Sequence, residues 1–186
     1  ISRSGSIAER KAFREGLVSV QDKASQLCAL AVGAQPGERV FDLCAAPGSK
    51  SFVMAQEMED RGELRAFDLY PARAGLIRQG AERLGLTCIR EGVGDASQFD
   101  ESLGLADRVL CDVPCSGLGI IRRKPEIRWK TAEELDALPP LQLSILENAA
   151  RYVRPGGTLV YSTCALSKAE NEGVAGAFLA KHPEFQ

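Results

Sequence analysis

The chain has 186 residues, of which 45% are apolar and 26% charged, and its formal net charge is −2. This composition is typical of one globular domain with a substantial core, and it excludes a disordered or strongly basic nucleic-acid-binding chain. No apolar run is long enough to cross a bilayer, and no signal-peptide pattern opens the sequence. We therefore expect a soluble, cytoplasmic protein that has no membrane partner.

The cysteines lack the paired C-x-x-C spacing of zinc sites, and the only histidine, His182, lies near the end of the chain. This pattern predicts no metal site, and a disulfide framework is not expected in an intracellular chain of this size. The thiols are expected to be reduced and either buried or catalytic. They belong to Cys28, Cys44, Cys88, Cys111, Cys115 and Cys164.

Short apolar runs alternate with helical patterns along the chain. Residues 1–20 show no clear period beyond a short amphipathic stretch at 8–14, and we treat them as a lead-in segment to a domain over 21–186. Five strands alternating with helices predict a doubly wound parallel α/β sheet. The expected strands are 39–44, 63–68, 86–90, 107–112 and 157–162, and the expected helices are 22–32, 49–59, 72–84, 132–153 with a break at Pro139-Pro140, and 168–181. The first of these helices is expected to bury Ala24, Leu27, Cys28 and Ala31.

Acidic and thiol side chains follow the carboxyl ends of the predicted strands. In doubly wound sheets, ligands bind at this edge, at the point where the strand order reverses. A single aspartate there is commonly a helix cap, but four at consecutive strand ends indicate a site. These residues are Asp42 with Cys44, then Asp68, Asp95, Asp112 with Cys115, and finally Cys164.

The turn after the first strand is suited to a nucleoside cofactor. Gly48 lets the backbone approach a ligand closely, and Asp68, 20 residues further on, suits the hydroxyls of a ribose. The turn lacks the G-x-G-x-x-G of dinucleotide sites, and the segment before Lys50 does not have P-loop spacing. S-adenosylmethionine has no phosphates to bind and is compatible with this turn.

Two cysteines, Cys115 and Cys164, lie on loops beside small and polar residues. A thiolate there can act as a nucleophile, and helix N-termini nearby are expected to favour the ionised form. The residues alone leave the two equal, whereas Cys28, Cys88 and Cys111 are interpreted as core residues.

The loop after Cys115 is basic and contains the only tryptophan. Cations for phosphates and an aromatic ring for stacking favour a single-stranded RNA contact. The alternative is a solvated charge run with Trp129 buried in the core. The loop residues are Arg122, Arg123, Lys124, Arg128, Trp129 and Lys130.

Four motifs occur in a recognisable order: DLCAAPGSK at 42–50, DVPCSG at 112–117, RRKPEIRW at 122–129 and YSTC at 161–164. Together they resemble the Sun/Fmu family of RNA cytosine-5 methyltransferases, and the likeness runs from Gly16 to the end of the chain. The resemblance implies a Rossmann-like class I methyltransferase sheet, S-adenosylmethionine as cofactor and methylation of cytosine C5 in RNA. Ribosomal RNA is the first expected target and tRNA the second.

The resemblance also implies separate roles for the two cysteines. Cys164 matches the nucleophile that adds to cytosine C6, and Cys115 matches the cysteine implicated in product release. Asp112 is expected to contact the target base, and Lys50 to lie beside Asp112. The expected cofactor shell is Cys44, Ala45, Ala46, Pro47, Gly48, Ser49, Lys50, Asp68, Arg73, Asp95 and Asp112.

The sequence departs from the family pattern at Ser49, where a second glycine is usual. The last two strands of a seven-stranded sheet and an N-terminal RNA-binding module are not found, so we expect a C-terminally truncated catalytic domain. A DNA cytosine methyltransferase would use Cys115 as nucleophile, but the additional Thr163-Cys164 pair favours RNA. A catalytically silent RNA-binding fragment is the remaining alternative.

Overall fold

The computed structural model describes residues 6–186 and contains one parallel sheet with the strand order β3-β2-β1-β4-β5. The doubly wound α/β prediction is therefore confirmed. The strands are β1 (Arg39–Asp42), β2 (Glu63–Asp68), β3 (Ile89–Val93), β4 (Ala106–Asp112) and β5 (Val153–Ser162). The helices are α1 (Lys11–Arg14), α2 (Lys23–Val32), α3 (Ser49–Glu57), α4 (Pro71–Leu84), α5 (Ala132–Asp136), α6 (Leu138–Ala150) and α7 (Val174–Lys181).

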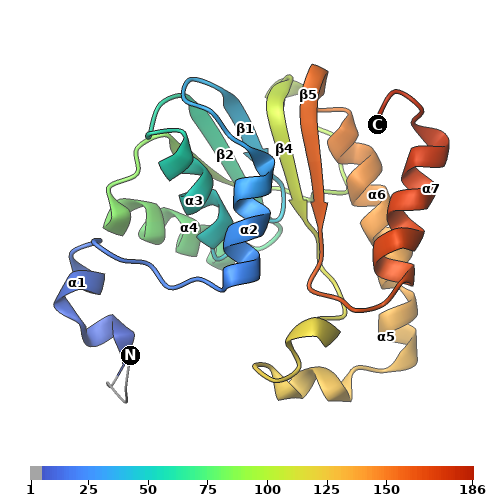
Figure 1. Cartoon of the computed structure of the whole chain (residues 1–186), viewed down its shortest axis with the longest axis horizontal. Coiled ribbons are helices and arrows are strands. Elements are labelled where there is room, and N and C mark those ends of the chain that lie inside the picture. The colour runs from blue at the N-terminus through green and yellow to red at the C-terminus, as the bar shows by residue number, and fades with distance from the viewer. Residues whose placement is uncertain (1–5) are drawn as a thin grey trace.

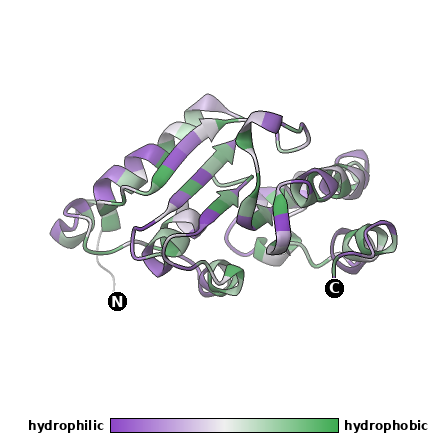
Figure 2. Ribbon diagram, turned by 90° about the horizontal axis from the view of Figure 1, so that it is seen from above, coloured by the Kyte–Doolittle hydropathy of each residue, from purple (hydrophilic) through white to green (hydrophobic). Residues whose placement is uncertain are grey.

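Helices cover both faces of the sheet (Figure 1). Because successive side chains of a strand point to opposite faces, Val40 packs with α2, α3 and α4, while its neighbour Phe41 packs with α6. Leu110 and Cys111 of β4 divide in the same way. Seen from above in Figure 2, the strands lie between the two groups of helices. This layering leaves the carboxyl ends of β1 and β4 as the place where the strand order reverses.

Two strands begin three or four residues away from the predicted position, and β4 begins one residue early, at Ala106. β3 begins at Ile89 rather than residue 86, because the Asp60 carboxylate accepts hydrogen bonds from the backbone amides of Thr87 and Cys88. β5 begins at Val153 rather than residue 157, because Val153 pairs with Ala106 across a register shift.

The predicted buried face of α2 is wrong. Ala29 and Val32 are buried, whereas Leu27 is 65% exposed. The apolar residues of α2 are spread over all of its faces, so periodicity alone does not select the face that packs on α3 and the sheet.

The later helices also depart from the predicted ranges. The segment 132–153 divides at Ala137, and Pro139 is accommodated in the first turn of α6, where no intrahelical donor is needed. The predicted helix at 168–181 begins as a π-helix, Ala169–Gly173, which leads into α7.

The lead-in segment contacts α4. The Arg83 guanidinium lies over the Phe13 ring and donates to the carbonyl oxygens of Phe13 and Val18. Within residues 6–186, no helix is long and apolar enough to span a membrane.

Candidate active site

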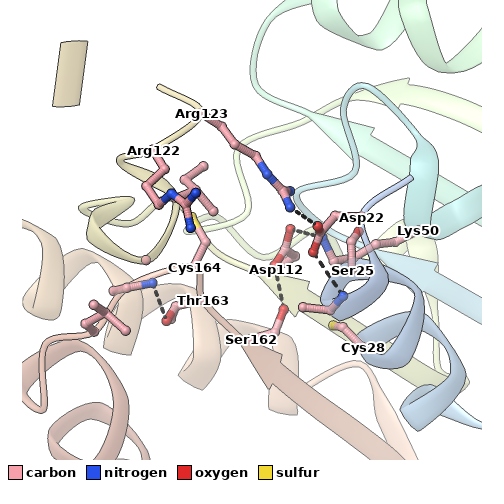
Figure 3. A pocket seen from close by; sticks show the side chains of 15 residues that line it. Asp22, Ser25, Cys28, Lys50, Asp112, Arg122, Arg123, Ser162, Thr163 and Cys164 are labelled. Carbon is pink, nitrogen blue, oxygen red and sulfur yellow. Dashed lines mark hydrogen bonds and ion pairs between the residues drawn. The ribbon is translucent and has the colours of Figure 1, made fainter. Parts of the chain in front are cut away.

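A cavity of about 900 Å³ opens at the carboxyl ends of β4 and β5, and α2, α3 and the basic loop complete its walls. The side chains around it converge from segments that are far apart in the sequence (Figure 3). Its polar lining includes Asp22, Ser25, Lys50, Asp112, Arg123 and Cys164. Asp22 caps α2 and forms an ion pair with Arg123, which ties the basic loop to that helix.

Lys50, Asp112 and Ser162 form a connected polar group on the cavity wall. Lys50 Nζ lies 2.6 Å from Asp112 Oδ2, and the Ser162 hydroxyl donates to Asp112 Oδ1 at 2.5 Å. The parallel register places Asp112 opposite Ser162, so the second contact follows from strand pairing. Burial lowers the pKa of the Lys50 amine, but the Asp112 carboxylate outweighs burial and the pKa lies above its usual value. The expected proximity of Lys50 and Asp112 is present.

The two loop cysteines are in direct contact. Cys115 Sγ lies 2.9 Å from Cys164 Sγ and accepts a hydrogen bond from the Cys164 backbone amide at 3.3 Å. Both side chains are partly buried. Cys164 lines the large cavity together with Lys50 and Asp112, whereas Cys115 is not among its lining residues. The structure therefore distinguishes two thiols that the sequence leaves equal.

The contact also shifts the pKa values of the two thiols in opposite directions. Hydrogen bonds from the Cys164 thiol, and then from the backbone amides of Cys164 and Gly117, lower the pKa of Cys115 to about 6. The pKa of Cys164 is raised, because Cys115 and then burial disfavour its thiolate. A three-residue 3₁₀ helix, Leu118–Ile120, follows Cys115, and the π-helix Ala169–Gly173 follows Cys164. Hydrogen bonds are what lower the pKa of Cys115.

The turn between β1 and α3 is tightly built. Gly48 has a φ of 104°, and a Cβ at this position would lie 2.5 Å from Phe52 Cζ. Asp42, at the end of β1, is fully buried, and its Oδ2 accepts a hydrogen bond from Ser51 at 2.7 Å. Burial raises the pKa of the Cys44 thiol, so this cysteine remains protonated. Ser49 fits as the first residue of α3.

The expected ribose-binding residue, Asp68, ends β2 and is nearly buried. Arg73 forms an ion pair with it at 3.3 Å and also donates to the Ala46 carbonyl, so one guanidinium joins two parts of the expected cofactor shell. Asp95 lies two residues beyond β3 and borders a second cavity of about 140 Å³ that Phe67 and Phe99 also line. A carboxylate beside a mostly apolar cavity fits the ribose and the flat base of a nucleoside.

The basic loop divides into parts with different surroundings. Arg122 and Arg123 line the large cavity, whereas Lys124 and Arg128 are exposed outside it. The interpretation of Trp129 as a core residue is wrong, because 80% of it is exposed, and Ile127 is the buried residue of this loop.

Several site residues were not singled out in the sequence. Asp22 and Ser25 reach the cavity from the start of α2, and the buried Glu170 carboxylate accepts a hydrogen bond from the Ser116 amide next to Cys115. These positions have no sequence signal, because they depend on packing between distant segments.

This doubly wound sheet, with a nucleoside-compatible turn at the switch point and a thiol pair beyond the ends of β4 and β5, has the fold of Rossmann-like S-adenosylmethionine-dependent methyltransferases. The chain belongs to the family described as 16S rRNA methyltransferase RsmB/F, which matches residues 29–186. The family resemblance inferred from the four motifs is therefore confirmed.

Individual relatives agree. The chain is 43% identical to the probable ribosomal RNA small subunit methyltransferase B of Bacillus subtilis, over 98% of this chain and 41% of that protein. It is 41% identical to ribosomal RNA small subunit methyltransferase B of Sodalis glossinidius, over 92% of this chain and 40% of that protein. The chain thus spans about two fifths of the length of these relatives.

A solved structure agrees as well. NSun6 from Pyrococcus horikoshii with SFG, an S-adenosylmethionine analogue, superimposes with a TM-score of 0.88 at 32% identity. The match covers 95% of this chain and 45% of that one.

Proposed function

We propose that this protein transfers a methyl group from S-adenosylmethionine to C5 of a cytosine in RNA, through a covalent bond between Cys164 and C6 of the base. The observation that carries the proposal is the placement of the two thiols: Cys164 lines the cavity beside Lys50 and Asp112, and Cys115 contacts it as a sulfur of lowered pKa. We assign this activity to the domain over residues 21–186.

The cofactor-binding residues are those at the carboxyl ends of β1, β2 and β3. The turn at 44–50 would hold the methionine end of the cofactor, Asp68 would accept hydrogen bonds from the ribose hydroxyls, and the cavity beside Asp95 would hold the base. The bound cofactor supplies an electrophilic methyl group. Arg73 lies between Ala46 and Asp68, so it contacts the same shell.

The residues of the cavity account for the remaining steps. The Cys164 thiol gives its proton to solvent as its sulfur forms a bond to C6. The electron pair of the C5–C6 double bond makes C5 nucleophilic. C5 would take the methyl group, whose bond to the cofactor sulfur breaks with its electron pair left on that sulfur. The Cys115 thiolate accepts the C5 proton, and the electron pair of the broken C5–H bond restores the aromatic ring and expels the Cys164 sulfur from C6. Lys50 and Asp112 hold the base in register on the cavity wall.

We propose ribosomal RNA as the substrate because the relatives of this chain carry that name, with tRNA as the second candidate. We further propose that the reaction takes place in the cytoplasm. The exposed Trp129 and the cations around it offer a stacking and phosphate-binding surface beside the cavity. A cytosine must leave its stack before a thiolate can reach C6, so an unpaired or flipped base is the expected target.

The test uses RNA that contains 5-fluorocytosine, which has no C5 proton to lose, together with tritiated S-adenosylmethionine. The wild-type protein is expected to form a labelled covalent adduct that survives a denaturing gel. Cys164→Ala is expected to form none, and Cys115→Ala is expected to retain it. An adduct with Cys164→Ala but not with Cys115→Ala would reverse the two roles. Absence of label with the wild type on both rRNA and tRNA would favour the silent RNA-binding alternative.

A further inference from the structure

Two consecutive residues of the π-helix Ala169–Gly173, Glu170 and Asn171, hold the loops that carry the two cysteines. This π-helix follows Cys164 closely and lies behind the thiol pair. A π-turn inside a helical segment is rare and is frequently found at functional sites. The two side chains reach different loops, one residue to each cysteine.

Glu170 holds the Cys115 loop. It is only 3% exposed, and its Oε2 accepts hydrogen bonds from the Ser116 backbone amide at 2.8 Å and from Gln142 Nε2 at 2.9 Å. Gln142, fully buried, also donates to the Pro114 carbonyl. The peptide groups on both sides of Cys115 are thus tied to one buried carboxylate, directly or through Gln142.

The same loop is held from its outer side. Lys130 Nζ donates to the carbonyl oxygens of Cys115 and Ser116, each at 3.1 Å. Burial raises the pKa of Glu170, but the donors at Ser116 and Gln142, with the Lys130 charge, outweigh it and the pKa lies below its usual value. Glu170 is therefore an anion inside the protein, with its charge met by hydrogen bonds.

Asn171 holds the Cys164 loop. Its Oδ1 accepts a hydrogen bond from the Thr163 hydroxyl at 2.7 Å, and its Nδ2 donates to the carbonyl oxygens of Ala165 and Ser167 at 3.2 and 2.9 Å. Thr163 and Ala165 flank Cys164, so one amide side chain holds the Thr163 hydroxyl before Cys164 and the Ala165 carbonyl after it. The Gly119 amide also donates to the Cys164 carbonyl at 2.9 Å.

We propose that Glu170 and Asn171 are positioning residues that set the distance between the two cysteine sulfurs, Glu170 by placing Cys115 and Asn171 by placing Cys164. Neither side chain lines the cavity, so they act through the thiols rather than on the substrate. The catalytic consequence rests on the proposed function: Glu170 supports the step that Cys115 performs, and Asn171 supports the attack by Cys164. Because the two residues are adjacent in one π-turn, movement of that turn changes both loops together.

The first test needs neither RNA nor cofactor. Diamide oxidises two adjacent thiols to a disulfide, taking up their two electrons and two protons, so its rate reports how close the Cys115 and Cys164 sulfurs are held. Peptide mapping measures the rate at which this disulfide forms. Glu170→Ala and Asn171→Ala are each expected to lower that rate at least about fivefold, since each change removes two or three hydrogen bonds. Glu170→Gln, which keeps an acceptor oxygen, is expected to be intermediate.

The matched control is Glu172→Ala, a carboxylate on the exposed side of the same π-turn. It is expected to form the disulfide at the wild-type rate. Wild-type rates for Glu170→Ala and Asn171→Ala as well would overturn the proposal. Thermal melting identifies a variant that does not fold. In that case its place is taken by Glu170→Gln or by Thr163→Val, which removes the hydroxyl that donates to Asn171, and the rate of disulfide formation is measured in the same way.

The second test separates positioning from a general loss of structure. With ordinary cytosine RNA, Glu170→Ala is expected to increase the fraction of protein trapped as the adduct, because release through Cys115 is impaired. Asn171→Ala is expected to slow adduct formation on 5-fluorocytosine RNA. Equal losses in both assays would contradict the division of roles. If the wild type forms no adduct at all, the proposed function fails, and the disulfide rates still decide whether Glu170 and Asn171 position the sulfurs.

Discussion

The Lys50 amine and the Asp112 carboxylate, 2.6 Å apart, join the first turn of α3 to the end of β4 across the point where the strand order reverses. The turn proposed for the cofactor and the wall proposed for the base thus share one ion pair. Because the side chain of Lys50 is only 16% exposed, this pair is shielded from solvent more than a surface salt bridge.

Replacing Lys50 with methionine is expected to slow adduct formation about a hundredfold, in the range of a lost acid–base or charge-stabilising group. The Asp112 carboxylate would keep only the Ser162 hydroxyl as a side-chain partner. Single-turnover assays at saturating cofactor measure the rate. The comparison is Lys181→Met, which removes an exposed lysine paired with Glu147 and is expected to leave the rate unchanged.

The Cys115 thiol is expected to titrate near pH 6 rather than near the value of about 8.5 for an ordinary cysteine. Alkylation by iodoacetamide requires the thiolate, so its rate at Cys115 should rise with pH through a midpoint near 6. Cys164→Ala removes the largest cause of the lowered pKa and should move this midpoint upward. Peptide mapping by mass spectrometry assigns the rates, and a midpoint unchanged by Cys164→Ala would argue against the sulfur–sulfur hydrogen bond.

Gly48→Ala is expected to weaken both folding and cofactor binding. The added Cβ would lie 2.5 Å from the Phe52 ring at a φ of 104°, which we expect to cost about 1–3 kcal/mol of unfolding free energy. Gly75→Ala is the matched control, because the residue is inside α4 and, apart from its neighbours and the helix backbone, no described atom lies within 4 Å of the added Cβ. There, alanine should raise stability by up to about 1 kcal/mol. Urea unfolding and cofactor titration measure the two effects.

Trp129→Ala is expected to leave the melting temperature unchanged, because the side chain is exposed. If the ring stacks on a base, the change should cost about 1–3 kcal/mol of RNA-binding free energy. Lys124→Ala should instead weaken binding to every sequence and reduce the salt dependence, as a phosphate contact would. Fluorescence titrations at several salt concentrations distinguish the two, and unaltered affinity for Trp129→Ala would exclude the stacking role.

Strands β1, β2 and β4 are predicted to within two residues, because each ends in an aspartate or a tight turn. β3 is misplaced since its edge position allows Arg90 and Glu91 within the strand, while the more apolar residues before it are held by Asp60. The buried face of α2 depends on contacts with α3 and the sheet that local periodicity does not contain.

In the site, too, some residues are predictable from local sequence and others depend on tertiary packing. Residues at strand ends, such as Asp112 and Cys164, are predictable because parallel strands bring their carboxyl ends together. The ion pair of Asp22 with Arg123 and the contact of Glu170 with Ser116 join segments whose meeting depends on the complete fold. Which cysteine lines the cavity is likewise a property of the packed loops, and in the sequence only the family resemblance separates them.

The buried Asp42 at the end of β1 links folding to proton uptake. Burial raises the pKa of its carboxyl to about 7, and its Oδ1 has no hydrogen-bond partner among residues 6–186. An unfolded aspartate loses its proton near pH 4, so between about pH 4 and 7 the folded chain holds a proton that the unfolded chain has released. The contribution of Asp42 to stability therefore declines as pH rises through this window. Near neutrality, one carboxyl beneath the proposed cofactor turn makes the stability of the whole domain sensitive to small changes in acidity.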